Sequence, residues 1–277
     1  MNDIAISDED YKKFCEFFYR KTGIFFDDSK RYFVDKRLVE RVEENKFKDF
    51  RSYFVQMRFA TDGIELQALI NCMTVNETYF MREDYQFKVL AETVMDEIVR
   101  YKRGGDPVRI WCIPSSTGEE PYSVGISLLE GWSGINEHDV EIFSSDIDTT
   151  VLQKAKAAKY SARSLMRMSE IMKQTYFKRV GDEYQLINDL RESVTFSQCN
   201  LSDEKETKRF KGIDVVFCRN LLIYFDDASR RVAVQNLYDS MSPGGFIFLG
   251  HSESMSRMSS LFKLRKFGSV IIYQKPL

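Results

Sequence analysis

Three polar segments of the sequence each follow a short apolar run and carry side chains that could do chemistry. They are residues 114–123, with two adjacent glutamates, residues 145–148, and residues 218–226, with an Arg-Asn pair. Backbone N–H groups at a helix start, together with carboxylates, suit a ligand with a cation or hydroxyls. A carboxylate at a strand end can accept both hydroxyls of a ribose. We therefore expect Asp146 to bind a ligand and Asp148 to cap a helix.

Residues 250–254, Gly-His-Ser-Glu-Ser, are similar to the nucleophile elbow G-x-S-x-G. The final glycine is replaced by Ser254, and no histidine follows Ser252. We therefore expect no catalytic serine and interpret His251 as a structural residue. A further segment rich in hydrogen-bond donors, residues 74–82, taken alone could be helix capping.

Two kinds of elements must position these residues. Up to about residue 90 the pattern predicts helices only, over residues 8–22, 29–44, 49–59 and 62–72. A helix over residues 84–102 then leads to the turn signal Gly104-Gly105-Asp106-Pro107. Strands and helices alternate from there, with strands at 108–113, 140–145, 194–199, 213–218 and 246–250 and helices at 119–132, 149–160 and 226–241. This alternation predicts an α/β fold with a parallel sheet covered on both faces, closed by an antiparallel pair at 264–267 and 269–274.

One stretch, residues 161–192, interrupts the alternation. Gly181-Asp182 separates two alternating runs, which indicates a hairpin and a small inserted antiparallel β-subdomain. We expect a helical domain over residues 1–90, a linker helix and loop over 91–107, and an α/β domain over 108–277.

Composition narrows the function classes. The chain has 277 residues, 43% hydrophobic and 30% charged, which indicates a globular protein. Its 40 basic and 42 acidic residues give a net charge of -2, which argues against nucleic acid as a partner. No apolar run is long enough to span a membrane and the start does not look like a signal peptide, so we expect a cytoplasmic protein. Five dispersed cysteines and two histidines favour reduced thiols and argue against a metal centre.

Several segments, in order along nearly the whole chain, resemble the chemotaxis receptor glutamate O-methyltransferase family, CheR. The similar segments are residues 74–82, 116–123, 145–148, 200–201, 217–225, 243–245 and 250–254. The resemblance implies a Rossmann-like class I S-adenosylmethionine-dependent methyltransferase sheet, an N-terminal helical domain and a small β-subdomain. It also implies methyl transfer to glutamate carboxylates of chemoreceptors, in their cytoplasmic helical region.

The resemblance implies roles for individual residues. Asn76, Thr78 and Arg82 would cover the cofactor, and Glu119 and Asp146 would bind its amino group and its ribose. The adenosine and methionine parts would lie against four further residues, Asn200, Leu201, Arg219 and Asn220. Arg82 and Tyr224 would lie nearest the methyl group as catalytic residues.

A basic stripe on the predicted second helix could dock on the receptor; it consists of Lys30, Lys36, Arg37 and Arg41. The alternative is a solvated face balanced by the neighbouring acidic residues Asp35, Glu40 and Glu43. We expect a monomer, and no dependence on a receptor C-terminal tethering peptide, because the hairpin at Gly181-Asp182 is short.

The sequence departs from the family at Cys112-Ile113-Pro114, where small residues are usual, which puts close approach of the cofactor there in doubt. Two alternatives therefore stay open: a scaffold or sensor that binds S-adenosylmethionine or S-adenosylhomocysteine without turnover, and a methyltransferase for another protein. A nicotinamide oxidoreductase is disfavoured, because the G-x-G-x-x-G fingerprint is missing. Residues 220–223 also differ from the Asn-Pro-Pro-aromatic arrangement that holds an extruded base.

Overall fold

The computed structural model describes residues 4–277, and the chain divides into two compact units. The helical unit contains the residues up to Val75 together with 224–229. The sheet unit contains residues 76–223 and 230–277. In the described residues, no helix is long and apolar enough to cross a membrane.

The helical unit has the four helices expected from the sequence: α1 (Asp8–Thr22), α2 (Arg31–Glu44), α3 (Phe50–Phe59) and α4 (Ile64–Met73). Helix α1 begins where Ser7 Oγ accepts a hydrogen bond from Asp10 N, and it ends at Gly23, whose φ of 75° is left-handed. Phe14 is fully buried among the rings of Phe50 and Phe54. The helices are therefore held by an aromatic core of their own.

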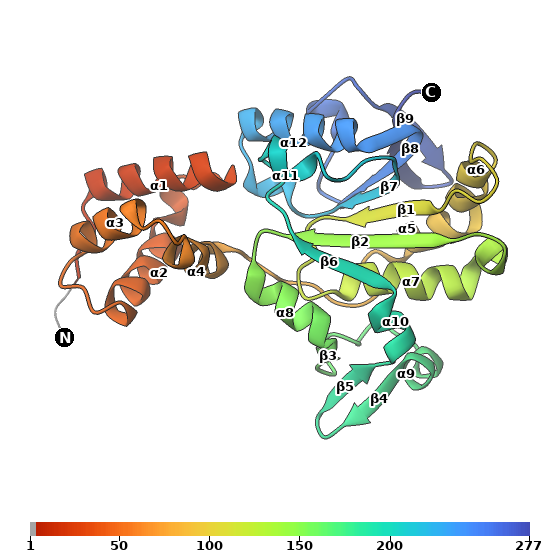
Figure 1. Ribbon diagram of the computed structural model, residues 1–277, viewed down its shortest axis with the longest axis horizontal. Coiled ribbons are helices and arrows are strands. Elements are labelled where there is room, and N and C mark those ends of the chain that lie inside the picture. The colour runs from red at the N-terminus through yellow and green to blue at the C-terminus, as the bar shows by residue number, and fades with distance from the viewer. Residues whose placement is uncertain (1–3) are drawn as a thin grey trace. The chain divides into compact units, whose positions relative to one another are not determined.

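A seven-stranded sheet forms the centre of the sheet unit (Figure 1), in the order β6-β2-β1-β7-β8-β10-β9. The strands are β1 (Val108–Cys112), β2 (Val140–Asp146), β6 (Val194–Gln198), β7 (Ile213–Cys218), β8 (Met241–Leu249), β9 (Lys263–Phe267) and β10 (Val270–Gln274). The first five pair in parallel, and β10 pairs antiparallel with both β8 and β9. The predicted α/β fold and its closing antiparallel pair are confirmed.

Helices of the sheet unit bury apolar side chains. They are α5 (Asp84–Val89), which continues through a π-helical turn (Leu90–Val94) into α6 (Met95–Val99), α7 (Glu119–Gly131), α8 (Thr149–Ala157) and α12 (Asp227–Ser240), whose first residues belong to the helical unit. The short helix α11 (Glu204–Thr207) follows β6. One continuous core joins α5, α6 and α7 to the inner strands, with Phe87, Leu90, Ile110 and Phe217 among its members.

A separate three-stranded antiparallel sheet projects from the sheet unit (Figure 1). Its strands are β3 (Lys159–Tyr160), β4 (Phe177–Val180) and β5 (Glu183–Leu186), with α9 (Glu170–Tyr176) and α10 (Asn188–Glu192) beside them. The turn between β4 and β5 contains Gly181 at φ 64°. The predicted hairpin and inserted β-subdomain are confirmed.

Three predicted boundaries differ from the structure. The helix expected to run to residue 160 ends at Ala157, because Ala158 is left-handed (φ 50°) and β3 follows as part of the small sheet. Strand β8 begins at Met241, before the Pro-Gly-Gly sequence taken as a turn, and its pairing with β7 shifts register there. The units divide at Val75 instead of near residue 90, because α5 and α6 pack into the core of the sheet.

Candidate functional site

The candidate site lies at the carboxyl ends of the parallel strands. The strand order reverses between the neighbours β1 and β7, and open α/β sheets bind ligands outside such a point. The loops after β1, β2 and β7 therefore meet at this edge, and they carry the three polar segments that the sequence singled out.

The loop after β1 is held closely against its neighbours. Ser115 N donates to Ser145 O at 2.7 Å. Gly118 has a φ of 97°, and a Cβ there would lie 3.0 Å from Ala155 Cβ, so the turn requires glycine. At the unusual Cys112-Ile113-Pro114 sequence, Ile113 N still donates to Phe217 O at 2.8 Å, and the Ile113–Pro114 peptide is cis. The departure from the family pattern leaves the pairing with β7 in place.

Asp146 ends β2 with its carboxylate turned into this loop. Its two oxygens accept hydrogen bonds from Ser116 N (2.8 Å) and Asp148 N (2.9 Å), and the residue is 3% exposed. Burial raises the pKa of Asp146 to about 6. Each carboxylate oxygen has a second lone pair, so Asp146 can still accept hydroxyl donors of a ligand.

Asp148 caps α8, as the sequence predicted. Its Oδ1 accepts from Thr150 N at 2.8 Å and Val151 N at 3.2 Å. Its Oδ2 accepts from Asn76 Nδ2 at 3.0 Å, while Asn76 O lies 3.4 Å from Ser116 Oγ. The cap thus fixes Asn76 beside the loop after β1.

The two adjacent glutamates at the start of α7 have different surroundings. Glu119 Oε2 accepts from Thr117 Oγ1 at 2.6 Å, and burial raises its pKa. Glu120 Oε2 accepts from Arg219 Nη1 at 3.0 Å, whereas its buried Oε1 has no hydrogen-bond partner among residues 4–277. Burial raises the pKa of Glu120 to about 7. A buried acceptor without a partner can receive a hydrogen bond from a cationic ligand group.

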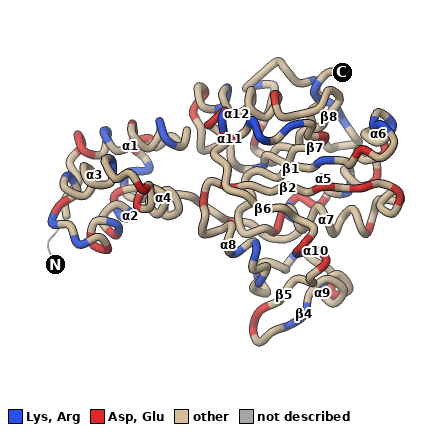
Figure 2. Tube along the Cα trace, viewed as in Figure 1, with Lys and Arg blue, Asp and Glu red and all other residues tan. Residues whose placement is uncertain are grey.

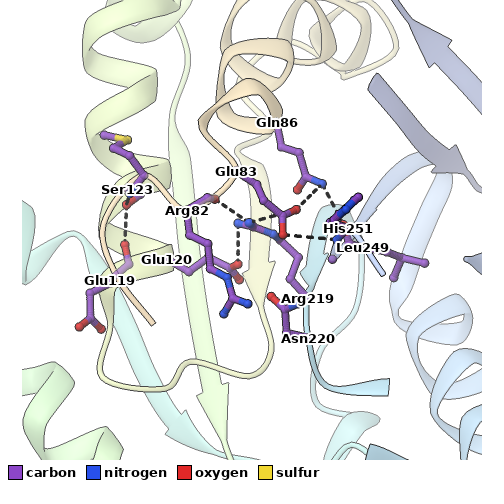
Figure 3. A network of polar contacts seen from close by, with 12 residues as sticks. Arg82, Glu83, Gln86, Glu119, Glu120, Ser123, Arg219, Asn220, Leu249 and His251 are labelled. Atoms are coloured by element: carbon purple, nitrogen blue, oxygen red, sulfur yellow. Dashed lines mark hydrogen bonds and ion pairs between the residues drawn. The ribbon is translucent and has the colours of Figure 1, made fainter. Parts of the chain in front are cut away.

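Arg82 and Arg219, which were expected at the same site, contact each other (Figure 3). Arg219 is paired with glutamates, whereas Arg82 forms no ion pair in the described residues. Arg219 Nη2 donates to Arg82 O at 2.5 Å, and the Arg219 side chain is 2% exposed. The guanidinium of Arg82 is half-buried and donates to Glu77 O at 3.0 Å. Within the described part of the chain it forms no ion pair, so it can receive an anionic group.

The remaining predicted cofactor residues lie in the sheet unit. Asn200 Oδ1 accepts from Ser202 N at 3.0 Å, and Leu201 O accepts from Asn236 Nδ2 at 2.8 Å. Asn220, in the loop after β7, is left-handed with a φ of 58°. Thr78 is half-buried in the segment that leads to Arg82.

Tyr224 and the basic stripe belong to the helical unit. Tyr224 is half-buried, and its carbonyl accepts from Phe25 N at 3.0 Å.

The stripe on α2 is not uniformly exposed, and acidic residues alternate with it (Figure 2). Lys30 and Lys36 are exposed, whereas Arg37 Nε donates to Cys72 O at 2.6 Å. Arg41 is bonded to Glu65.

The donor set at the sheet edge has a chemical pattern. It offers a buried carboxylate oxygen on Glu120 for a cation and a carboxylate on Asp146 for hydroxyls. These groups fit the ammonium and the ribose of an amino acid joined to a nucleoside. Adjacent glutamates at a helix start, such as Glu119 and Glu120, cannot be told apart in the sequence, because it does not give the direction of each side chain.

Comparison with known proteins agrees with this geometry. The model "CheR methyltransferase, all-alpha domain" matches residues 9–74, and "CheR methyltransferase, SAM binding domain" matches residues 76–271. The chain is 52% identical, over all of its length and 96% of the relative, to chemotaxis protein methyltransferase 2 of Vibrio cholerae. It is 36% identical to the chemotaxis protein methyltransferase of Salmonella typhimurium, over 95% of this chain and 89% of that one. The protein from Escherichia coli is 34% identical, with coverage of 95% and 90%.

Both units are thus matched by one family over nearly their whole length, and the orphan carboxylate, the strand-end aspartate and the glycine turn suit the cofactor of that family. The chain belongs to the CheR family of S-adenosylmethionine-dependent methyltransferases.

Proposed function

We propose that this chain methylates glutamate side chains in the cytoplasmic helical region of chemoreceptors, forming glutamate methyl esters. The names of its relatives, chemotaxis protein methyltransferases, support a substrate in chemotaxis. A cytoplasmic, monomeric enzyme is part of the proposal, as is independence from a tethering peptide at the receptor C-terminus.

Residues of the sheet unit hold the cofactor in this proposal. Asp146 accepts the ribose hydroxyls, and Glu120 accepts the methionine ammonium in place of the Glu119 expected from the sequence. The cofactor supplies a methyl group made electrophilic by its sulfonium. Further cofactor contacts in this proposal come from Asn76, Thr78, Asn200, Leu201 and Asn220.

The acceptor needs no general base. A glutamate side chain with an unperturbed pKa of about 4.3 is ionised at neutral pH and is already a nucleophile. What the protein must supply is orientation and removal of water from the carboxylate. A guanidinium can supply the orientation through a charge-assisted hydrogen bond.

The observation that carries this proposal is the unpaired charge of Arg82. Its guanidinium donates to Glu77 O and lies 5.9 Å from the ring centre of Tyr79, and it forms no ion pair with a carboxylate of residues 4–277. It can therefore pair with the carboxylate of a substrate. If Arg82 bound that carboxylate tightly it would also stabilise the ground state, so we assign it an orienting role.

Kinetics of Arg82→Ala, measured with saturating S-adenosylmethionine and a receptor cytoplasmic fragment, test the proposal. We expect kcat to fall on the order of 100-fold, because a misoriented acceptor loses its in-line geometry. Unchanged turnover would remove Arg82 from the reaction.

The alternatives predict other results in the same experiment. A binding scaffold without turnover binds S-adenosylhomocysteine but methylates no fragment. A methyltransferase for another protein methylates a different component of a cell extract and ignores the receptor. Arg82→Lys serves as the matched control, because it keeps the charge while losing the planar pair of donors.

A further inference from the structure

The backbone on both sides of Arg82 is held in an unusual conformation. Met81 and Glu83 have φ angles of 58° and 59°, in the left-handed region that side chains other than glycine seldom adopt. Such conformations persist only where surrounding contacts enforce them, and they gather at functional sites. The contacts that hold the turn of residues 81–83 therefore help to set the direction of the Arg82 side chain.

Three neighbours hold the turn from outside. Ser123 on α7 accepts a hydrogen bond from Met81 N at 3.0 Å. Arg219, directly after β7, donates to Arg82 O at 2.5 Å. Gln86 donates from its side chain to Glu83 (3.2 Å) and to Leu249 O (2.8 Å), which connects the turn to the end of β8.

Arg219 is central among them because its guanidinium joins three polar groups (Figure 3). Nη1 donates to Glu120, and Nη2 donates to Arg82 O and lies 3.4 Å from Glu83 Oε2. The guanidinium also stacks 5.4 Å from the ring centre of Phe87. The side chain is 2% exposed, and only Nε has no partner in the described residues.

We propose that Arg219 is a positioning residue that fixes the strained turn of residues 81–83 and thereby the direction of Arg82. The proposal rests on the proposed function, because it assigns Arg219 an effect on methyl transfer through Arg82. It replaces the expectation that the Arg219 side chain itself lines the cofactor. The alternative is that the remaining Nε–H donates directly to the cofactor, and the two differ in what they predict for binding.

Arg219→Lys is the first test variant, because an ammonium keeps the charge between Glu83 and Glu120 but lacks the fork that reaches Arg82 O. We expect the affinity for S-adenosylhomocysteine, measured by calorimetry, to change less than about threefold, and kcat to fall on the order of 100-fold. In native-state hydrogen exchange, the amide of Met81 should exchange faster, because the turn it belongs to is no longer fixed. A loss of affinity that parallels the loss of kcat, with Met81 exchange unchanged, would overturn the proposal.

A double-mutant cycle tests whether Arg219 acts through Arg82. In the Arg82→Ala background, Arg219→Lys should cost less than about threefold in kcat, because the group it positions is gone. Additive losses would mean that Arg219 acts independently, and would contradict the proposal.

Two further variants keep the test interpretable. Ser123→Ala removes the hydrogen bond to Met81 N, together with the one that Ser123 Oγ donates to Glu119 O within α7. It should give the same pattern with a smaller effect, which covers the case in which Arg219→Lys does not fold. Arg265→Lys is the matched control, because Arg265 also pairs with a glutamate, Glu97, and stacks on the ring of Phe267, in β9. It should change neither kcat nor Met81 exchange.

The experiment distinguishes a failure of the proposed function from a failure of the proposed role of Arg219. If no receptor fragment is methylated by the wild-type chain, the hydrogen-exchange comparison still decides whether Arg219 fixes the turn.

Discussion

The backbone nitrogen of Asn220 lies 2.8 Å from Oε2 of Glu253 and donates a hydrogen bond to it. The same carboxylate accepts from Gly250 N and Leu222 N, both at 2.8 Å. A Cβ at residue 250 would lie 2.9 Å from Asn220 N, so only glycine permits this approach. The segment that looks like a nucleophile elbow in the sequence is therefore a clamp on the loop after β7.

Glu253→Gln should lower the free energy of unfolding by about 1–3 kcal/mol. A carboxamide has one acceptor oxygen where the carboxylate has two, so at least one of the three backbone donors loses its partner. Urea unfolding followed by circular dichroism measures the change.

Ser252→Ala is the matched control for this prediction. It should leave both stability and methyl transfer unchanged, since the structure gives Ser252 no catalytic partner in its loop. Abolished activity in Ser252→Ala would revive a catalytic serine.

Stability without cofactor should depend on pH through Glu120. Its pKa in the folded chain, about 7, lies above the ordinary 4.5, so between these values the folded state binds more protons than the unfolded state. The contribution is fully present below pH 4.5 and is lost as pH rises towards 7, by up to about 3 kcal/mol. We therefore expect the wild-type chain to lose stability relative to Glu120→Gln over this range; parallel profiles for the two proteins would contradict it.

Binding of S-adenosylhomocysteine should release a proton from Glu120. An ammonium beside the carboxylate favours its charged form, and at pH 6.5 a group with a pKa of about 7 is still roughly three-quarters protonated. Calorimetry in two buffers of different ionisation enthalpy gives the number of protons released. Glu120→Gln should remove the protons that Glu120 releases. Any protons that Asp146 releases on binding should remain.

Glu119→Gln is the control that decides between the neighbouring glutamates. It should leave the proton release in place, because Glu119 is bonded to Thr117. If Glu119→Gln abolishes the release and Glu120→Gln does not, the assignment drawn from the sequence is the right one.

Docking on an acidic receptor should depend on two exposed lysines, Lys36 in α2 and Lys30 in the 3-10 turn directly before it. Charge reversal at both Lys30 and Lys36 should raise KM for the receptor fragment several-fold while cofactor affinity stays constant, because rim charges act mainly on association.

Arg41→Glu tests the other half of the stripe. It should instead lower the melting temperature, because Arg41 and Tyr53 both bond Glu65 within the helical unit. An unchanged KM in the lysine variant would favour the solvated-face interpretation of the stripe.

Much of the fold follows from local pattern. The capping serine and terminal glycine of α1, and the alternation of strands and helices after residue 107, predict elements that the structure contains. The end of α8 could not be predicted, because a left-handed Ala158 has no sequence signal and β3 forms only by pairing with β5. The extent of β8 depends likewise on its pairing with β7 across a Pro-Gly-Gly sequence.

Within the site, the residue types predict which ligand groups could bind, but they do not predict the direction of each side chain. The cap at Asp148 follows from its place before a helix, and the structure confirms it. The orphan oxygen of Glu120, the left-handed residues beside Arg82 and the clamp at Glu253 arise from contacts between distant segments. Periodicity and motifs do not contain that information.

Methylation of receptor glutamates is best tested by the chemistry of the product. A receptor cytoplasmic fragment is incubated with the chain and S-adenosylmethionine labelled in its methyl group, and the fragment is then treated with mild base. We expect label on the fragment that base releases as methanol. This label should be absent when the acceptor glutamates are replaced by glutamine or alanine, and strongly reduced with Arg82→Ala. Label that withstands base, or no label while S-adenosylhomocysteine still binds, would contradict the proposed function.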